Sequence, residues 1–315
     1  MKFQAQAFSS MSAGRPDPPP SSTLGLAYGV AAYGLWGFMP IYLKAVRAAP
    51  VLEVLAHRIV WALVLLVLLS WRWGQLGALA ALLRPGRTLG ILAVSTLAIA
   101  VNWLVYIFAV VNDRVMEASL GYYINPLVTV SLGVLVLGER LERPVLVALA
   151  IAAAGVLWLA LRAGQPPWIA LLLAASFGTY GLMRKLAPVG ALVGLAVETM
   201  LLLPLAGGYL LWALVSGRSA FLAGHARLDM LLLLAGPVTA FPLLCFAAAA
   251  RRLPLTTLGF LQYLSPSLQL VLAVLVYSEP FDRTRAVAFA FIWTALAIFA
   301  VHTARRGAAE PVTDA

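Results

Sequence analysis

Four ionisable side chains stand out because they fall inside, or at the start of, long apolar segments. His57, Arg58 and Glu198 lie in the interior of such segments, and Glu117 lies at the beginning of another. A charge in an apolar segment is costly, and its usual roles are a buried partner, a gate or a proton relay. We predict that these four residues act in gating or coupling.

Arg58 and Glu198 are expected to approach one another. Their segments lie far apart in the sequence and are predicted to run in opposite directions, which brings the two charges to a similar depth. Two interpretations stay open, a static buried ion pair and a group that moves during function. Glu117 and Glu53 begin their segments, where a carboxylate also stabilises the helix dipole. His57 is the side chain type that titrates near neutral pH.

Prolines inside apolar segments mark places where a helix loses a backbone hydrogen bond. Such a proline has no N–H for the carbonyl four residues earlier, and in lipid that carbonyl needs a neighbour, a water or a ligand. Four such sites predict helices that meet around a cavity, with a tolerated kink as the alternative for any single proline. The prolines and the carbonyls that they free are Pro40 with Trp36, Pro126 with Tyr122, Pro242 with Val238, and Pro266 with Gln262.

Polar and aromatic residues cluster around these prolines. Asn102, Tyr106 and Ala109 follow helical spacing, so one helix face presents an amide and a ring. Such a lining suits a small amphipathic or aromatic solute, held by stacking and hydrogen bonds without a strong fixed charge. The predicted cavity residues are Trp36, Pro40, Asn102, Trp103, Tyr106, Tyr122, Tyr123, Asn125, Pro126, Tyr180, Pro242, Gln262, Tyr263, Ser265 and Pro266.

The elements that must position these residues are membrane-spanning helices. The chain has 315 residues, of which 63% are hydrophobic and 11% charged, and its mean hydropathy is +0.94. That composition leaves too little polar surface to cover a soluble domain. Apolar runs of about 20 residues, the length that crosses a bilayer, predict an all-α integral membrane protein with ten transmembrane helices. The predicted spans are 24–44, 52–71, 88–111, 116–137, 145–161, 167–183, 190–215, 229–250, 254–277 and 286–303.

An internal repeat divides the chain into two related halves. Residues 123–143 recur without gaps as residues 263–283, with tyrosine, proline, glutamate and arginine at matching positions. Because each half has an odd number of helices, the second half is predicted to be inverted relative to the first, an arrangement typical of secondary transporters. The predicted organisation is a disordered cytoplasmic leader (1–21), a first five-helix repeat (22–162), a second five-helix repeat (163–304) and a cytoplasmic tail (305–315).

The excess of basic residues predicts the orientation in the membrane. Lysine and arginine number 22 against 12 acidic residues. They are spread over short loops, as expected for topological charge and not for a nucleic-acid surface. The loops on the side of the N-terminus carry the larger share, which predicts that both termini are cytoplasmic.

Cysteines and catalytic signatures are sparse. Cys245 is the single cysteine, so neither an intramolecular disulfide nor a cysteine metal cluster can form. The sequence holds no metal-binding, phosphate-binding or hydrolytic motif, and we predict no metal, no cofactor and no enzymatic activity. The expected partners are a small-molecule substrate and the lipid bilayer, without nucleic acid. Ten helices in one chain suffice for a monomer.

Four short segments carry a family resemblance, namely 55–59 (LAHRI), 102–106 (NWLVY), 117–126 (EASLGYYINP) and 259–263 (GFLQY). In these segments the chain resembles the RarD subgroup of EamA-type permeases, in the drug/metabolite transporter superfamily. The resemblance extends over about residues 24–303. It implies two inverted five-helix repeats, cytoplasmic termini, and a central cavity lined chiefly by spans one, three, four, six, eight and nine.

The chain also departs from relatives in that superfamily. It lacks the membrane-centre glutamate in span one of the small four-helix multidrug relatives, and it lacks the cluster of basic cavity residues expected for phosphate-sugar exchange. The resemblance therefore implies a neutral or zwitterionic cargo.

Together these features predict a secondary transporter of the bacterial cytoplasmic (inner) membrane. It is expected to export a small neutral, zwitterionic or aromatic metabolite or drug by alternating access, as the two halves rock around the cavity. An uncoupled facilitator of the same solutes is a first alternative, and a scaffold or receptor that moves no solute is a second. A membrane enzyme ranks last because the sequence offers no catalytic constellation.

Overall fold

Ten helices in the described part of the chain are long and apolar enough to cross a membrane, which confirms the predicted fold class. The structure is a computed structural model that describes residues 22–112, 114–162, 167–278 and 283–309. The predicted leader and the end of the tail lie outside the described residues.

The first half contains α1 (Ser22–Gly37), α2 (Met39–Ala45), α3 (Val51–Arg72), the short α4 (Leu76–Leu82), α5 (Arg87–Val111), α6 (Val115–Leu137) and α7 (Arg143–Arg162). The second half contains α8 (Trp168–Leu186), α9 (Ala191–Val215), α10 (Ala226–Arg252), α11 (Leu255–Gln262), α12 (Leu264–Val271), the π-helical turn η1 (Leu272–Val276) and α13 (Arg283–Ala309).

Two of the ten spans are broken, where the sequence predicted continuous helices. Span one breaks at Phe38, between α1 and α2, and span nine breaks at Tyr263, between α11 and α12. Pro40 and Pro266 follow these breaks within the first turn of the new helix, where a proline removes no hydrogen bond from that new helix itself. By contrast, α6 continues through Pro126 as one helix. A proline in an apolar segment therefore breaks the helix at some positions and not at others.

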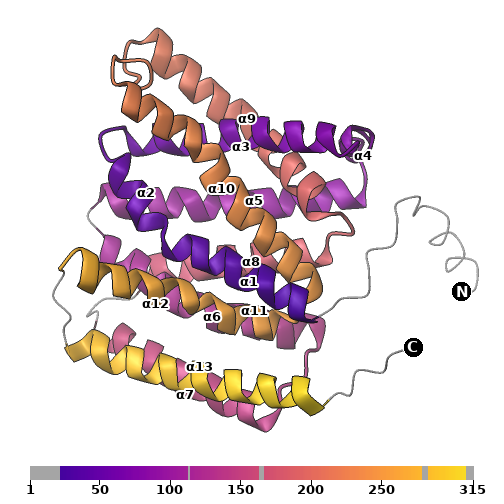
Figure 1. Ribbon diagram of the computed structural model, residues 1–315, viewed down its shortest axis with the longest axis vertical. Coiled ribbons are helices and arrows are strands. Elements are labelled where there is room, and N and C mark those ends of the chain that lie inside the picture. Colours follow the sequence, from indigo (N-terminus) through magenta and orange to yellow (C-terminus); the bar gives the residue numbers. More distant parts are fainter. Residues whose placement is uncertain (1–21, 113, 163–166, 279–282, 310–315) are drawn as a thin grey trace, which may run out of the picture.

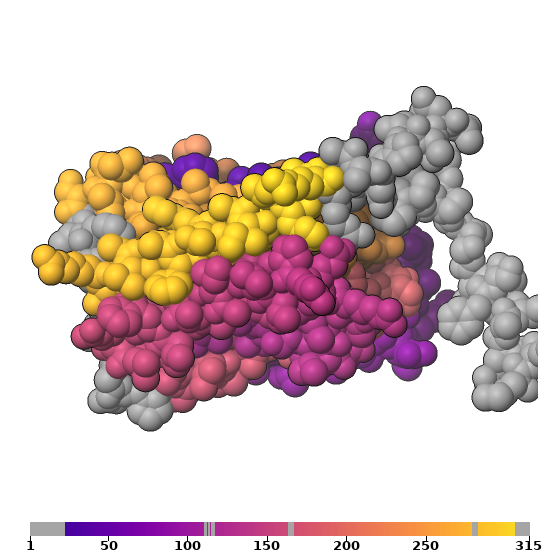
Figure 2. All heavy atoms as spheres, turned by 90° about the horizontal axis from the view of Figure 1, so that it is seen from below, coloured from indigo at the N-terminus to yellow at the C-terminus, as the bar shows by residue number. Residues whose placement is uncertain are grey.

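The helices lie side by side along the long axis of the molecule (Figure 1). α3 and α9 pack together at one end of that axis, and α7 and α13 pack together at the other. In Figure 2, α13 (yellow) lies beside α7 (magenta) on one outer face. α1 begins and α13 ends on the same side of the bundle (Figure 1), as an even number of spans requires.

α3 and α9 run in opposite directions. Glu53, in the first turn of α3, accepts hydrogen bonds from the backbone N–H groups of Ala220 and Phe221, which lie in the loop after α9. The beginning of α3 therefore lies beside the end of α9. Opposite directions are what the sequence predicts for these two helices.

Glycines let the helices approach closely at several crossings. A Cβ on Gly259 of α11 would lie 2.7 Å from Cγ2 of Val130 and 2.9 Å from the carbonyl oxygen of Pro126, both on α6. A Cβ on Gly25 of α1 would lie 2.9 Å from Cδ2 of Leu253. Lipid gives helices no hydrophobic reason to associate, so close backbone approach is a main source of packing energy. α6 and α11 therefore cross in near backbone contact.

Candidate functional site

A cavity of about 190 Å³ lies in the middle of the bundle. Its wall is drawn from spans one, three, four, six, eight and nine, which are the six spans that the resemblance implies, and α3 adds Arg58. α6 contributes Ala118, Gly121, Tyr122 and Asn125, which share one helical face. The wall combines aromatic rings, carboxamides and one guanidinium.

Most of the predicted cavity residues lie on this wall. They are Trp36, Pro40, Asn102, Trp103, Tyr106, Tyr122, Asn125, Gln262, Ser265 and Pro266. A further predicted residue, Tyr123, lines a second cavity that adjoins the first.

Four predicted residues lie away from the walls of both cavities. Tyr263 is 1% exposed, and its hydroxyl donates a hydrogen bond to the Tyr123 carbonyl oxygen at 3.3 Å. Tyr180 is fully buried against another aromatic ring. The carbonyl oxygen of Pro126 lies against Gly259 on α11, and Pro242 is buried in α10. Closeness in sequence to the cavity residues was misleading here, because the helical period turns neighbouring residues toward different faces.

The carbonyl that Pro40 frees is satisfied at the cavity wall. Gln269 on α12 donates from Nε2 to the Trp36 carbonyl oxygen at 3.2 Å, and it also contacts Ser265 Oγ at 3.2 Å. A backbone carbonyl in a lipid-embedded protein needs such a partner when its own helix provides none. A side chain from one broken span therefore completes the backbone of the other.

Carboxamides on the wall also connect the helices and leave acceptors unused. Asn102 Nδ2 donates to the Leu173 carbonyl oxygen at 2.9 Å and to Ser176 Oγ at 3.1 Å, which joins α5 to α8. The side-chain oxygens of Asn125 and Gln262 are buried and have no partner within the described residues. An unpaired buried acceptor is costly, so these two carboxamides beside the cavity are left with hydrogen-bonding capacity that the described conformation does not satisfy.

Arg58 places a fixed positive charge on the wall, so the expectation of a lining without strong charge is wrong. Its Nε donates to Thr239 Oγ1 at 2.9 Å, and its guanidinium carbon lies 5.6 Å from the Trp103 ring centroid. Among the described residues, no aspartate or glutamate lines this cavity. The sequence singled out Arg58 but did not reveal that it faces the solute space.

The expected pairing of Arg58 with Glu198 is also wrong. Glu198 accepts a hydrogen bond from Ser95 Oγ at 2.6 Å and lies 3.5 Å from Arg184 Nη1. Arg58 and Glu198 both lie in the first half of their helices, and those helices run in opposite directions. Their charges therefore lie toward opposite ends of the bundle. The prediction that the two charges lie at a similar depth is therefore wrong.

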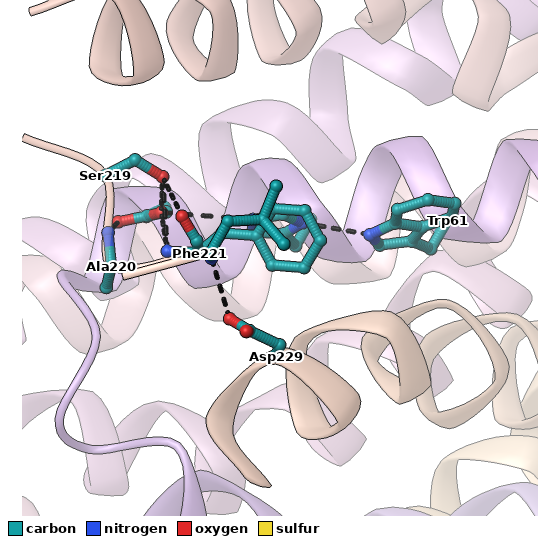
Figure 3. A network of polar contacts seen from close by, with 8 residues as sticks. Trp61, Ser219, Ala220, Phe221 and Asp229 are labelled. Atoms are coloured by element: carbon teal, nitrogen blue, oxygen red, sulfur yellow. Dashed lines mark hydrogen bonds and ion pairs between the residues drawn. The ribbon is translucent and has the colours of Figure 1, made fainter. Parts of the chain in front are cut away.

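A polar network lies where α3 begins, and Figure 3 shows its members Trp61, Ser219 and Phe221. His57 belongs to this network and lines neither cavity. Its Nδ1 accepts a hydrogen bond from Trp61 Nε1 at 2.9 Å, and its Nε2 lies 3.9 Å from Glu53 Oε1. Glu53 is 0% exposed and accepts hydrogen bonds from Ser219 Oγ at 2.7 Å and from the Phe221 N–H at 3.0 Å. The network fixes the loop after α9 to the first two turns of α3.

Glu117 forms an ion pair at the beginning of α6 and lines neither cavity. Arg114 Nε donates to Glu117 Oε1 at 2.6 Å, and the Arg114 guanidinium carbon lies 5.2 Å from the Trp168 ring centroid. This geometry favours the helix-dipole alternative for Glu117. Within the described ranges, acidic side chains do not gather with histidine or cysteine into a group of three that could hold a metal ion.

A second cavity, of about 430 Å³, adjoins the first on the side where α2 ends and α6 begins. The two share Pro40, Tyr122 and Gln269, and the second adds Lys44 and Tyr277. Lys44 Nζ lies 3.0 Å from the Tyr277 ring centroid. Since α1 begins on the opposite side, the central cavity opens away from the side where the described chain starts and ends.

An aromatic floor, formed by Tyr33, Phe177, Tyr180 and Phe246, closes the other side of the central cavity. Tyr180 and Phe246 stack with centroids 5.5 Å apart and an interplanar angle of 16°, and Phe177 lies 5.3 Å from Phe246. Tyr33, Tyr180 and Phe246 are at most 2% exposed. The aromatic floor therefore separates the cavity from the side where α1 begins.

Beyond the aromatic floor, the ends of α8 and α10 are tied together. Lys185 Nζ donates to the carbonyl oxygens of Leu253 at 2.5 Å and Ala250 at 3.4 Å. The guanidinium carbon of Arg252 lies 5.4 Å from the ring centroid of Tyr28 on α1. These contacts hold three helices together on the closed side.

Among the polar and aromatic residues of the wall, three were missed in the sequence, namely Tyr33, Phe177 and Gln269. Each lies about one helical turn from a predicted cavity residue. Extending each predicted position by three or four residues along its helix would have found them.

The fold and the cavity together define a class of protein. Ten spanning helices surround a central cavity with access from one side, the architecture of a multi-pass membrane transporter. The EamA-like transporter family matches residues 23–161. "Protein RarD" of Escherichia coli (strain K12) is 45% identical over 285 residues, covering 90% of this chain and 96% of the relative.

An "Uncharacterized transporter" of Vibrio cholerae is 45% identical over 288 residues, covering 90% of this chain and 95% of the relative. The chain belongs to the EamA-like transporter family, and within it to the RarD-type permeases of the bacterial inner membrane. A solved crystal structure of a protein 20% identical in sequence matches with a TM-score of 0.67, covering 90% of this chain and 98% of that chain. This last likeness shows the fold alone.

Proposed function

We propose that this protein is a secondary transporter that moves a small aromatic or amphipathic solute by alternating access, with the central cavity as the binding site. The observation that carries the proposal is the asymmetry of the central cavity. On one side it adjoins the second cavity, from here on called the outer cavity, and on the other side it meets the aromatic floor. A binding site in mid-membrane with access from one side is how a carrier avoids an open pore.

Two inverted repeats, 22–162 and 163–304, provide the conformational exchange. Helix pairing supports this division, since α5 packs on α8 and its repeat equivalent α10 packs on α1. The repeat-equivalent helices α6 and α11 cross each other, and Tyr263 donates to the carbonyl of its repeat partner Tyr123. If the two halves exchange conformations, the opening moves from one side to the other.

The direction of transport is export, with both termini in the cytoplasm. The distribution of lysine and arginine supports this orientation. In that orientation the described conformation is open to the outside, which is the side where an exporter releases its solute. The Lys185 contacts then lie on the cytoplasmic side.

Flux across liposomes tests the proposal. Purified protein would be reconstituted into liposomes loaded with radiolabelled aromatic amino acids, aromatic carboxylic acids and aromatic amines. We expect protein-dependent efflux of at least one class. A scaffold or receptor would give the efflux of protein-free liposomes for every solute, and an imposed pH gradient would separate a proton-coupled carrier from a facilitator.

A pair of asparagine variants shows whether the cavity carries the flux. Asn102→Ala removes two hydrogen bonds at the wall, and we expect efflux to fall about tenfold or more. Asn112→Ala is the matched control, because Asn112, directly after α5, is exposed and its side chain donates to the Phe108 carbonyl of that helix. Equal efflux from both variants would argue against this cavity as the pathway.

A further inference from the structure

We propose that Arg58 binds the anionic end of the substrate, so that the cavity takes a compact aromatic carboxylic acid in its carboxylate form. This inference rests on the proposed transport function and adds the chemical class of the solute. It replaces the neutral or zwitterionic cargo that the sequence implied.

The guanidinium of Arg58 is the positively charged group on the cavity wall and is suited to bind an anion. Its Nε bonds Thr239. Its Nη1 and Nη2 have no hydrogen-bond partner among the described residues, and no carboxylate of those residues pairs with it. The edge that carries both Nη atoms is the edge that binds a carboxylate through two parallel hydrogen bonds.

The contacts that Arg58 does make hold this edge in place. The Thr239 hydroxyl fixes Nε at 2.9 Å, and the guanidinium carbon lies 5.6 Å from the Trp103 ring centroid. Arginine suits such a site because its planar fork is stiff and its charge persists at any physiological pH. A carboxylate would therefore meet a preorganised partner.

A second arginine in the bundle, Arg184, is buried and paired with a carboxylate, which provides a comparison for Arg58. Arg184 is 0% exposed, and Glu198 lies 3.5 Å away as its counter-charge. Arg58 has no such counter-charge among the described residues, although a charge inside a membrane span is costly unless it is paired or faces a polar space. The missing counter-charge is supplied by the substrate.

The remainder of the wall selects the body of the solute. Trp36, Trp103 and Tyr122 present rings to the space, which favours an aromatic group by stacking and edge contacts. The carboxamide residues Asn125 and Gln262 line the same space and make part of its wall polar. A space of about 190 Å³ limits the solute to a compact molecule.

The test uses three compounds of the same shape and different charge. Thermal unfolding of the purified protein in nanodiscs would be followed with 3-phenylpropionate, 3-phenylpropanamide or 3-phenylpropylamine. A ligand that binds the folded state raises the melting temperature. We expect a saturable rise with the acid and none with the amide or the amine. A rise with the amide or the amine equal to that with the acid, or no rise with the acid, would overturn the inference.

Two variants separate binding from structural support. Arg58→Gln removes the charge and is expected to weaken binding of the acid by about tenfold or more, the effect of losing a charge-assisted hydrogen bond. Thr239→Val removes the hydrogen bond that positions the guanidinium but leaves its charge, so it should weaken binding of the acid less than Arg58→Gln does. Equal losses in the two variants would mean that Arg58 has only a structural role. If Arg58→Gln does not fold, Arg58→Lys keeps the charge without the fork and should show an intermediate loss.

Flux measurements keep this inference distinct from the proposed function. Binding of the acid without efflux would contradict transport and leave the anion site standing. Efflux of the amide or the amine without preference for the acid would support transport and overturn the anion site.

Discussion

At the scale of single residues, the Trp36 carbonyl shows how a break in a spanning helix is stabilised. Gln269 donates to this carbonyl because Pro40 cannot. We expect Gln269→Leu to lower the free energy of unfolding by about 1–3 kcal/mol, the cost of a buried acceptor without a partner. Adding Pro40→Ala should recover part of the loss, since an alanine in place of this proline brings back an N–H.

Unfolding of the two variants and their combination in mixed detergent micelles would measure this coupling. Pro40→Ala alone provides the control for effects of the proline ring. A double variant that is no more stable than Gln269→Leu would mean that the two residues do not share the carbonyl.

The Arg184–Glu198 pair gives a second prediction at the residue scale. Both side chains are buried, so removing one leaves the other charge without compensation. We expect Glu198→Leu to lower the free energy of unfolding by about 3–5 kcal/mol. Arg184→Met combined with Glu198→Leu should recover most of the loss, because a buried ion pair can be replaced by apolar side chains at little cost. A double variant as unstable as Glu198→Leu would contradict this explanation.

At the scale of elements, the crossing of α6 and α11 depends on a glycine. A Cβ on Gly259 would lie 2.7 Å from Val130 and 2.9 Å from the Pro126 carbonyl. We expect Gly259→Ala to lower the free energy of unfolding by about 1–3 kcal/mol through overpacking. Gly208→Ala is the matched control, because a Cβ at Gly208 meets nothing within 4 Å and alanine favours a helix. Equal stability of the two variants would argue against a tight crossing.

For the helices, the sequence predicted the positions of the spans but not the breaks within them. Span positions followed from hydropathy alone, because crossing a bilayer requires only length and apolar character. The breaks at Phe38 and Tyr263 did not follow, since Pro126 carries the same sequence signal within an unbroken helix. Whether a proline breaks a helix depends on a distant partner, as Gln269 shows for Trp36.

The candidate site was less predictable for a related reason. Helical spacing at Asn102 and Tyr106, together with the clustering of polar and aromatic residues around the prolines, identified much of the cavity wall. The partner of Arg58 could not be inferred, because hydropathy locates each helix in the sequence without fixing how far two antiparallel helices are offset along one another. Charge pairs in this bundle are set by rotation and depth together, and the sequence constrains neither closely.

At the scale of the whole molecule, exchange between two conformations should appear as reciprocal accessibility. In a Cys245→Ala background, Ser119→Cys reports on the open side and Ala249→Cys on the closed side, since Ser119 lines the outer cavity and Ala249 is 0% exposed. We expect Lys185→Met to release the end of α8 from α10, and so to slow modification of Ser119→Cys by a maleimide and accelerate that of Ala249→Cys.

Labelling of the two cysteines in the otherwise unchanged background provides the reference rates. Faster labelling at both positions would indicate general loosening of the bundle. That result would contradict the idea that the Lys185 contacts control which side of the protein is open.

The aromatic floor has a consequence for affinity. A solute on the side where α1 begins cannot reach the cavity in the described conformation, because Tyr180 and Phe246 lie between. It binds only the fraction of molecules in which that side is open, so its apparent dissociation constant equals the intrinsic constant divided by this fraction. One binding site thus presents two different apparent affinities across one membrane. Replacing Tyr180 or Phe246, the two rings of the floor that line neither cavity, shifts the ratio of those affinities without touching the bound solute.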